Sequence, residues 1–249
     1  MKMKNNTILI TGGGSGIGRG LAEAFQALGN KVIIAGRGTK KLEETVTANP
    51  GMDFLTVDMT QAADIERFAA EATERFPELN VLINNAGIMR KELFAKHNLD
   101  DAVATVETNL LGPIRLTSFM LPHLQQQAEA TIINVSSGLA FVPKPTHPTY
   151  CATKAALHSF SISLRVQLEN TSVSVIELAP PYVQTELNGP EQATDPRAMP
   201  LADYIEESIR ILTADDKIDE VLVENVKILR FAEQSGKFDE ALSFLKQME

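Results

Sequence analysis

Tyr150 and Lys154 stand four residues apart in Tyr150-Cys151-Ala152-Thr153-Lys154. On a helix, residues at this spacing share one face, so the phenol and the ammonium group project into the same space. A cation roughly 5 Å from a phenol, at an effective dielectric near 20, favours the phenolate by about 3 kcal/mol, or roughly two pKa units. The spacing therefore predicts a tyrosine able to give a proton to a carbonyl oxygen or take one from an alcohol.

Ser137 adds a hydroxyl group to this pair. It closes the apolar segment that ends Val135-Ser136-Ser137, which we predict to be a strand running toward the helix of Tyr150. A serine there can donate a hydrogen bond to the same substrate oxygen that exchanges its proton with Tyr150. The Tyr-Lys spacing alone is a weak signal, and the position of Ser137 strengthens it.

A glycine-rich turn lies near the start of the chain, between a predicted strand and a predicted helix. It reads Thr11-Gly12-Gly13-Gly14-Ser15-Gly16-Ile17-Gly18 and fits the pattern T-G-x-x-x-G-x-G. Backbone N–H groups at such a helix start bind a pyrophosphate. Arg19 and Gly20 stand where a P-loop needs Lys and Ser or Thr, which excludes that motif. The alternative is a turn that is merely flexible.

Gly36 and Arg37 end the second predicted strand, where a dinucleotide-binding fold places the group that meets the adenosine ribose. A carboxylate at this point would repel a 2′-phosphate, whereas glycine removes that repulsion and arginine offers a fork suited to phosphate. This favours NADP(H), with NAD(H) possible. The alternative is that Arg37 is a solvated charge, since residue 15 of the glycine loop is serine and not a second basic residue.

Elements that could position these residues alternate along the chain. Predicted strands are Thr7–Thr11, Lys31–Ala35, Asp53–Val57, Val81–Asn84, Thr131–Val135 and Val173–Leu178, and predicted helices are Ile17–Leu28, Ala62–Phe76, Asp101–Gln127 and Tyr150–Glu169. This order predicts the α/β class, with a doubly wound parallel sheet of Rossmann-like type. We expect one domain over residues 1–249, with a substrate loop and small helical C-terminal cap at about 186–249.

Composition narrows the function further. The chain has 249 residues, 44% hydrophobic and 22% charged, with a net charge of −9, which argues against a nucleic-acid or anionic-membrane surface. One cysteine forms no internal disulfide, and the four histidines lack metal-ligand spacing, so we predict no metal site. No apolar segment is long enough for a signal peptide or a spanning helix, which predicts a cytoplasmic protein.

These motifs, in this order, resemble the compact form of the short-chain dehydrogenase/reductase family over positions 7 to about 187. The resemblance implies a catalytic tetrad in which Tyr150 is the acid/base, Lys154 lowers its pKa and holds the ribose, Ser137 polarises the substrate, and Asn109 anchors a proton-relay water. It implies cofactor contacts from Gly12, Ser15, Gly16, Ile17, Gly18, Arg37, Asp58, Met59, Asn85, Ala86, Gly87, Tyr150, Lys154, Pro180, Val183 and Thr185. Residues 109–117 and 136–142 resemble bacterial oxidoreductases named after the lipoteichoic-acid D-alanylation locus.

The chain departs from the family pattern in two places. Pro181 stands where the family usually has glycine after the sixth strand, so the loop that carries Val183 and Thr185 is expected to be reshaped. Where the compact family often has a seventh strand, we predict two polar helices, Val221–Gln234 and Phe238–Met248. We therefore expect a homodimer built on the helices Asp101–Gln127 and Tyr150–Glu169.

Several other residues follow predicted strands or lie near Tyr150. Leu139, Phe141, Val142, Tyr182 and Leu187 are predicted to form an apolar substrate pocket. Arg90 is a surface charge or a group that attracts an anionic substrate. His97, His123, His147 and His158 are read as surface or helix residues, with His147 close enough to Tyr150 to line the pocket, and Cys151 as a small core residue.

The motifs together predict an oxidoreductase that interconverts a carbonyl compound and a secondary alcohol with NADP(H), acting on a small molecule. The first alternative is a nucleotide-binding, redox-responsive regulator without turnover. The second is a sugar-nucleotide epimerase or dehydratase, which would need a longer chain with a C-terminal substrate domain. The third is a purely structural protein.

Overall fold

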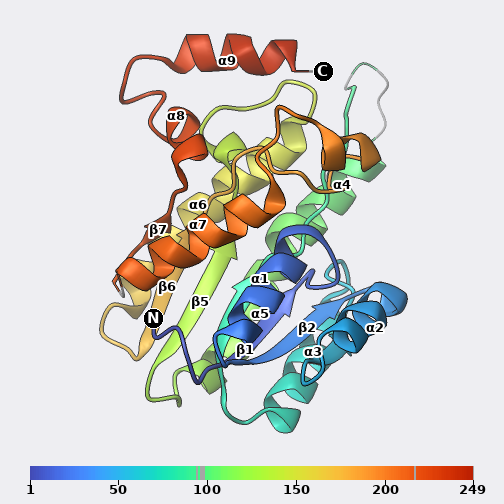
Figure 1. Ribbon diagram of the computed structural model, residues 1–249, viewed down its shortest axis with the longest axis vertical. Helices are drawn as coiled ribbons and strands as arrows, with labels where there is room; N and C mark the ends of the chain where they lie inside the picture. The colour runs from blue at the N-terminus through green and yellow to red at the C-terminus, as the bar shows by residue number, and fades with distance from the viewer. Residues whose placement is uncertain (94, 96–98, 216, 249) are drawn as a thin grey trace.

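The computed structural model describes residues 1–93, 95, 99–215 and 217–248. Within them a parallel sheet of seven strands runs in the order β3-β2-β1-β4-β5-β6-β7 (Figure 1). The strands are β1 (Thr7–Thr11), β2 (Lys31–Gly36), β3 (Asp53–Thr56), β4 (Leu79–Asn84), β5 (Ala130–Val135), β6 (Val173–Leu178) and β7 (Glu220–Val221). This confirms the predicted doubly wound sheet. The order in which strands are added to the sheet reverses between β1 and β4, which is where such sheets bind ligands.

Helices cover both faces of the sheet. The longer ones are α1 (Gly16–Ala27), α2 (Thr39–Ala48), α3 (Ala62–Arg75), α5 (Gly112–Leu124), α6 (Pro148–Leu168) and α7 (Leu201–Ala214). Buried residues of α1 and α7 share one apolar cluster, and those of α3, α5 and α6 share the other. The sheet is thus covered on both faces, as its continuous runs of Ile, Val and Leu predict.

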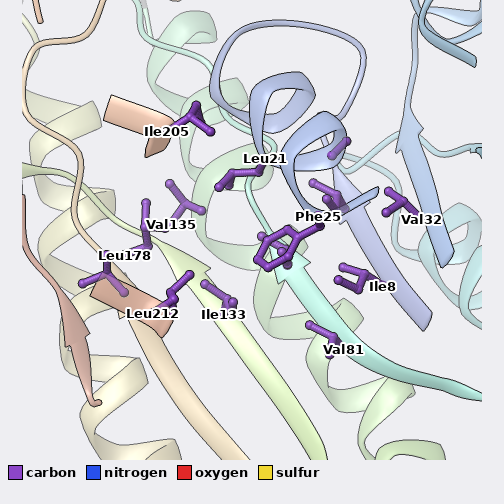
Figure 2. Packing of buried hydrophobic residues seen from close by; sticks show 14 of the residues in the cluster. Ile8, Leu21, Phe25, Val32, Val81, Ile133, Val135, Leu178, Ile205 and Leu212 are labelled. Carbon is purple, nitrogen blue, oxygen red and sulfur yellow. The ribbon is translucent and has the colours of Figure 1, made fainter. Parts of the chain in front are cut away.

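Successive residues of each strand point to opposite faces of the sheet. On β1, Ile8 packs in the cluster of α1 and α7, whereas Leu9 packs in the cluster of α3, α5 and α6. Figure 2 shows the first cluster, in which Phe25 of α1 and Leu212 of α7 lie over Ile133 of β5. This alternation decides which strand residues face α6.

The predicted helix Asp101–Gln127 is observed in three parts, α4 (Asp100–Val106), a π-helical turn (Glu107–Leu111) and α5. The Gly112 N–H donates to the Glu107 carbonyl oxygen, five residues back. A side chain at Gly112 would place its Cβ 2.8 Å from the Met59 carbonyl oxygen, so this close approach requires glycine. Such turns are frequent at functional sites, and this one contains Asn109.

The C-terminal prediction was wrong in part. A seventh strand is present, with Glu220 and Val221 paired to Glu177 and Leu178 of β6. The predicted helix Val221–Gln234 is reduced to a 3₁₀ turn (Glu224–Val226) and the short α8 (Lys227–Arg230). A two-residue strand is too short to show a strand pattern, and the helical pattern of the neighbouring residues concealed it.

The last helix, α9 (Phe238–Gln247), agrees with the predicted Phe238–Met248. Residues of α9 and of the segment before it form a third apolar cluster with Val142, which follows β5. The C-terminal segment therefore covers the chain that leaves the end of β5. Across the described residues, none of the helices is both long and apolar enough to cross a bilayer.

Candidate functional site

The glycine loop joins β1 to α1. Gly16 has φ of +51°, a left-handed conformation that glycine adopts without strain. A Cβ on Gly18 would lie 2.3 Å from the Gly12 carbonyl oxygen, so the first helical turn packs directly on the loop. Ser15 caps α1 with extended backbone and no side-chain cap hydrogen bond. The N–H groups at the start of α1 are the donors that such a loop offers to an anion.

Asn85, which follows β4, fastens this loop to the neighbouring strand. Its Nδ2 donates to the Thr11 carbonyl oxygen at 2.9 Å, and its backbone N–H donates to Thr11 Oγ1 at 3.0 Å. The Ala86 N–H also donates to Thr11 Oγ1, at 3.1 Å. The loops after β1 and β4 are therefore one hydrogen-bonded unit at the switch point of the sheet.

A cavity of about 820 Å³ opens over this unit. The predicted site residues that line it are Gly12, Ser15, Gly16, Ile17, Gly18, Asn85, Ala86, Gly87, Ser137, Tyr150, Lys154, Pro180, Val183 and Thr185. Arg37, Asp58, Met59 and Asn109 lie outside its lining. Arg37 is exposed just after β2, and Asp58 follows β3, so both lie at the strand ends on the β2 and β3 side of the glycine loop.

Tyr150 and Lys154 both reach this cavity from α6. The Lys154 Nζ lies 5.7 Å from the centre of the Tyr150 ring and donates to the Val135 carbonyl oxygen at 2.7 Å. Val135 is the last residue of β5, so this bond holds the helix against the carboxyl end of the strand. The predicted one-turn stacking of the two side chains is thus present in the structure.

The predicted effect of Lys154 on Tyr150 is not found in the cofactor-free chain. Burial raises the pKa of Tyr150 to about 12, and an interaction with Ser137 opposes the rise. Burial also lowers the pKa of Lys154 to about 8, against an opposing effect of Glu177. The attraction between the two charges favours the phenolate, but burial also removes the water around each group, which disfavours both charged forms.

Asn109 is buried beside the cavity, within the π-helical turn. Its Oδ1 accepts a hydrogen bond from the Ile88 N–H at 2.8 Å, and its Nδ2 donates to the Ile88 carbonyl oxygen at 2.8 Å. Ile88 lines the cavity. The Asn109 side chain is therefore engaged in holding the loop after β4.

Ser137 begins a 3₁₀ turn, Gly138–Ala140, and its Oγ accepts a hydrogen bond from the Leu139 N–H at 3.1 Å. This turn directs the following chain toward the C-terminal segment. A Cβ on Gly138 would lie 2.9 Å from both Val226 and Leu229. Ser137 consequently faces the cavity, whereas the residues that follow it pack against the C-terminal segment.

The predicted apolar pocket was mostly wrong for this reason. Of its five residues, only Leu187 lines the cavity. Leu139 and Val142 pack in the C-terminal cluster. The Phe141 ring contacts His158 edge-on, and the Tyr182 hydroxyl donates to Asp195 Oδ2 at 3.1 Å.

The loop after β6 keeps Pro180, Val183 and Thr185 on the cavity despite Pro181. Gln192, which the sequence did not indicate, is buried and donates through Nε2 to the Val183 carbonyl oxygen at 2.7 Å and to Thr185 Oγ1 at 3.1 Å. Residues 182–184 also pair with Met199. These contacts hold the loop that carries Val183 and Thr185.

His147, predicted to be a surface or helix residue close enough to Tyr150 to line the pocket, is instead buried at the N-cap of α6 and lies outside the cavity lining. Its Nε2 lies 2.9 Å from Oδ1 of Asn188, a cavity residue, and burial lowers the pKa of this imidazole. Its place three residues before Tyr150 was the one signal in the sequence. His147 joins the start of the helix to the loop that covers the cavity.

The other histidines, Cys151 and Arg90 lie at the following places in the fold. His123 and His158 lie on α5 and α6, and His97 is outside the described residues. Cys151 is buried, as predicted for a core residue, and burial raises its thiol pKa. Arg90 lines the cavity and lies 3.8 Å from Asp101. Cavity residues with no signal in the sequence include Arg19, Asn188 and the ion pair Lys41–Glu186, at 3.2 Å.

These features fit a dinucleotide. The helix start offers N–H donors, the missing Cβ of Gly18 lets the first turn of α1 pack directly on the glycine loop, and the cavity runs from that loop to Tyr150 and Ser137. Residues 6–196 match the family described as short chain dehydrogenase.

The chain belongs to the short-chain dehydrogenase/reductase family.

Relatives agree with this membership. The chain is 48% identical over 191 residues to the uncharacterized oxidoreductase DltE of Bacillus subtilis, covering 76% of this chain and 75% of that protein. It is 31% identical over 194 residues to dehydrogenase/reductase SDR family member 7B of Mus musculus, covering 75% of this chain and 60% of that protein. The family resemblance seen in the sequence is confirmed, and this short-chain dehydrogenase/reductase is an NAD(P)-dependent oxidoreductase.

Solved structures share the fold. A short chain dehydrogenase from Burkholderia cenocepacia in complex with NADP has a TM-score of 0.81 at 24% identity, covering 99% of both chains. One from Burkholderia phymatum in complex with NAD has a TM-score of 0.84 at 21% identity, covering 96% of both. Serine dehydrogenase from Escherichia coli has a TM-score of 0.75 at 26% identity, covering 86% of this chain and 95% of that one.

The depressed pKa of Lys154 predicts a pH-dependent stability. Between pH of about 8 and 10.5, the unfolded chain holds a lysine proton that the folded chain has released, so stability should rise with pH across this window. Relative to Lys154→Met, the free energy of unfolding should rise by about 3 kcal/mol. Urea denaturation at several pH values measures this. Parallel plots of the free energy of unfolding against pH for the unsubstituted chain and Lys154→Met would contradict this prediction. Lys40→Met, at an exposed lysine, is the control and should give the same pH dependence as the unsubstituted chain.

Proposed function

We propose that this enzyme interconverts a small-molecule carbonyl compound and a secondary alcohol, using NADP(H). The observation that carries the proposal is that Tyr150 and Lys154, one turn apart on α6, open onto the same cavity as the glycine loop after β1. When bound, the nicotinamide supplies or accepts the hydride. The protein has to hold the substrate oxygen and move a proton at that atom.

Tyr150 is the proposed general acid and base. With its pKa raised to about 12 by burial, the phenol is protonated at neutral pH, which suits the transfer of a proton to a carbonyl oxygen. The reverse reaction requires the phenolate, which the Lys154 ammonium group stabilises by charge. Ser137 donates a hydrogen bond to the same substrate oxygen, and Asn109 acts by holding the loop at Ile88.

We propose that groups at the ends of four strands, together with Lys154 of α6, hold the cofactor. The N–H donors at Ser15–Gly18 receive the diphosphate, and Asp58 with Met59 is placed after β3 for the adenine. Gly36 and Arg37 accommodate a 2′-phosphate, which favours NADP(H) over NAD(H). Lys154 holds the nicotinamide ribose, while Val183 and Thr185 meet the carboxamide.

Residues of about 186–249 act as the substrate loop and cap of a single catalytic domain. Support comes from Leu187, Asn188 and Gln192, which line the cavity, and from the C-terminal cluster that packs on the chain after Ser137. None of the relatives described above is named as a regulator, and the first experiment below separates turnover from binding alone.

Tyr150→Phe should lower kcat about 10²- to 10⁴-fold, because it removes the transferable proton and keeps the ring. Nicotinamide absorbance with a panel of ketones and alcohols measures turnover, and NADPH fluorescence measures binding, which should be nearly unchanged. Tyr182→Phe, whose hydroxyl contacts Asp195 outside the cavity lining, is the matched control and should keep full activity. An active Tyr150→Phe would exclude the proposed mechanism.

Arg37→Ala should weaken NADPH binding about tenfold to a hundredfold and leave NADH binding unchanged, because it removes a charged hydrogen-bond donor from the 2′-phosphate. Titration of each cofactor against the protein measures the ratio of the two dissociation constants. Arg90→Ala removes an arginine from the cavity lining itself and should leave the ratio as it is. A strong preference of the unsubstituted enzyme for NADH would overturn the assignment.

We also propose a homodimer through the outer faces of α5 and α6. Phe119, Ile162 and Val166 are 41%, 44% and 62% exposed there, which is costly for apolar side chains left in water. Light scattering should give the mass of a dimer, and Ile162→Glu with Val166→Glu the mass of a monomer. Ile228→Glu, at an apolar residue of α8 that is 65% exposed, is the control and should stay dimeric. A tetramer would refute the proposed assembly.

A further inference from the structure

A row of four polar residues crosses the carboxyl end of the sheet beneath α6. Asn84 pairs in register with Asn134, Asn134 with Glu177, and Glu177 with Glu220, so the row runs from β4 to β7. Its neighbours along the strands are almost all apolar. A polar row in the middle of an apolar layer is costly unless each member has partners.

Glu177 faces α6 because of its place on β6. Val175, two residues earlier, packs in the cluster that contains Leu164 and Leu168 of α6. Residues two apart on a strand point to the same face, so the Glu177 side chain also lies on the side of α6. His158 of that helix confirms this, since its Nδ1 lies 2.6 Å from Glu177 Oε2.

The two asparagines of the row are held mainly by uncharged groups. Asn84 Nδ2 donates to Asn134 Oδ1 at 2.8 Å, and Asn134 Nδ2 donates to Ser161 Oγ at 2.9 Å. Asn84 Oδ1 and Glu177 Oε1 are both buried without a hydrogen-bond partner among the described residues, but Glu177 differs because it carries a carboxylate on a side chain that is 1% exposed. A buried carboxylate with one free oxygen needs a nearby positive charge.

Lys154 supplies such a charge. It lies one turn before His158 on α6, and its Nζ binds the carbonyl oxygen of Val135, the neighbour of Asn134 on β5. Glu177 is the group whose charge favours the protonated form of this lysine. Resting on the proposed function of Lys154, we propose that Glu177, held by His158, is a positioning residue that keeps the Lys154 ammonium group charged behind the active site.

The far end of the cluster is closed by the C-terminal segment. Arg230 of α8 binds Glu220 through Nε at 3.1 Å and Nη2 at 3.0 Å, and its guanidinium lies 4.7 Å from the centre of the Phe141 ring. His158, Glu177 and Glu220 bring ligand atoms within 4.8 Å of one another. Among the described residues, Arg230 pairs with Glu220, His158 lies against both carboxylates, and Lys154 interacts with Glu177 by charge.

The protonation of Lys154 can be measured directly on the cofactor-free protein by ¹³C NMR of the lysine Cε atoms, with its signal assigned by its loss in Lys154→Met. The midpoint should lie near pH 8 in the unsubstituted chain. Glu177→Gln should lower the Lys154 midpoint by about one pH unit, because the opposite charge is removed. Glu177→Asp keeps that charge and should leave the midpoint close to that of the unsubstituted chain. An unchanged midpoint in Glu177→Gln, or equal midpoints for Gln and Asp, would overturn the proposal.

Two variants of His158, whose side chain is partly exposed, test whether this residue holds Glu177 in place for Lys154. His158→Ala removes the contact that holds Glu177 Oε2, so the carboxylate is free to move away from Lys154, and the Lys154 midpoint should also fall. His158→Gln retains an N–H donor and should lower it less. If Glu177→Gln does not fold, the two His158 variants alone test the proposal. Equal Lys154 midpoints in His158→Ala and His158→Gln would then refute it.

Kinetics gives a second measure that a general structural defect would not mimic. The ratio of kcat for Glu177→Gln to that of the unsubstituted enzyme should fall as pH rises from 6 to 8, because the variant loses the lysine charge at lower pH. A ratio that stays constant over this range would contradict the proposal. The NMR result stands whether or not Tyr150 is the acid/base, so the two proposals fail independently.

Discussion

The hydrogen bond from the Lys154 ammonium group to the Val135 carbonyl oxygen connects the candidate active site to the sheet. A buried cation is costly in a protein interior, so its position is restricted to places where acceptors and opposite charge are available. The last residue of β5 offers the acceptor, and the neighbouring β6 offers Glu177. Because Tyr150 is one turn away on the same helix, fixing the lysine also fixes the phenol over the cavity.

The parallel sheet makes this arrangement possible. All of its strands end at the same edge, so the loops after β1, β4, β5 and β6 meet around one cavity although they are far apart in sequence. Asn85 joins the first two of these loops, and Gln192 steadies the last. The π-helical turn at Asn109 holds Ile88, which lines the cavity after β4.

The C-terminal segment contributes more than a cover. It packs on the chain that follows Ser137, and its short strand places Glu220 beside Glu177. Arg230 then joins this strand to the ring of Phe141. The segment where the sequence departs most from the family pattern is therefore in contact with the turn after Ser137 and with the charges behind Lys154.

The amino-acid sequence by itself determined the first six strands, the glycine loop and the four-residue spacing of Tyr150 and Lys154, because these depend on residues close together in the chain. Only the tertiary structure decided the seventh strand, the burial of His147, and the turn that takes Leu139 and Val142 away from the cavity. It also decided that burial raises the pKa of Tyr150. Pairing, burial and solvation are set by residues that meet only after folding, so no local pattern records them.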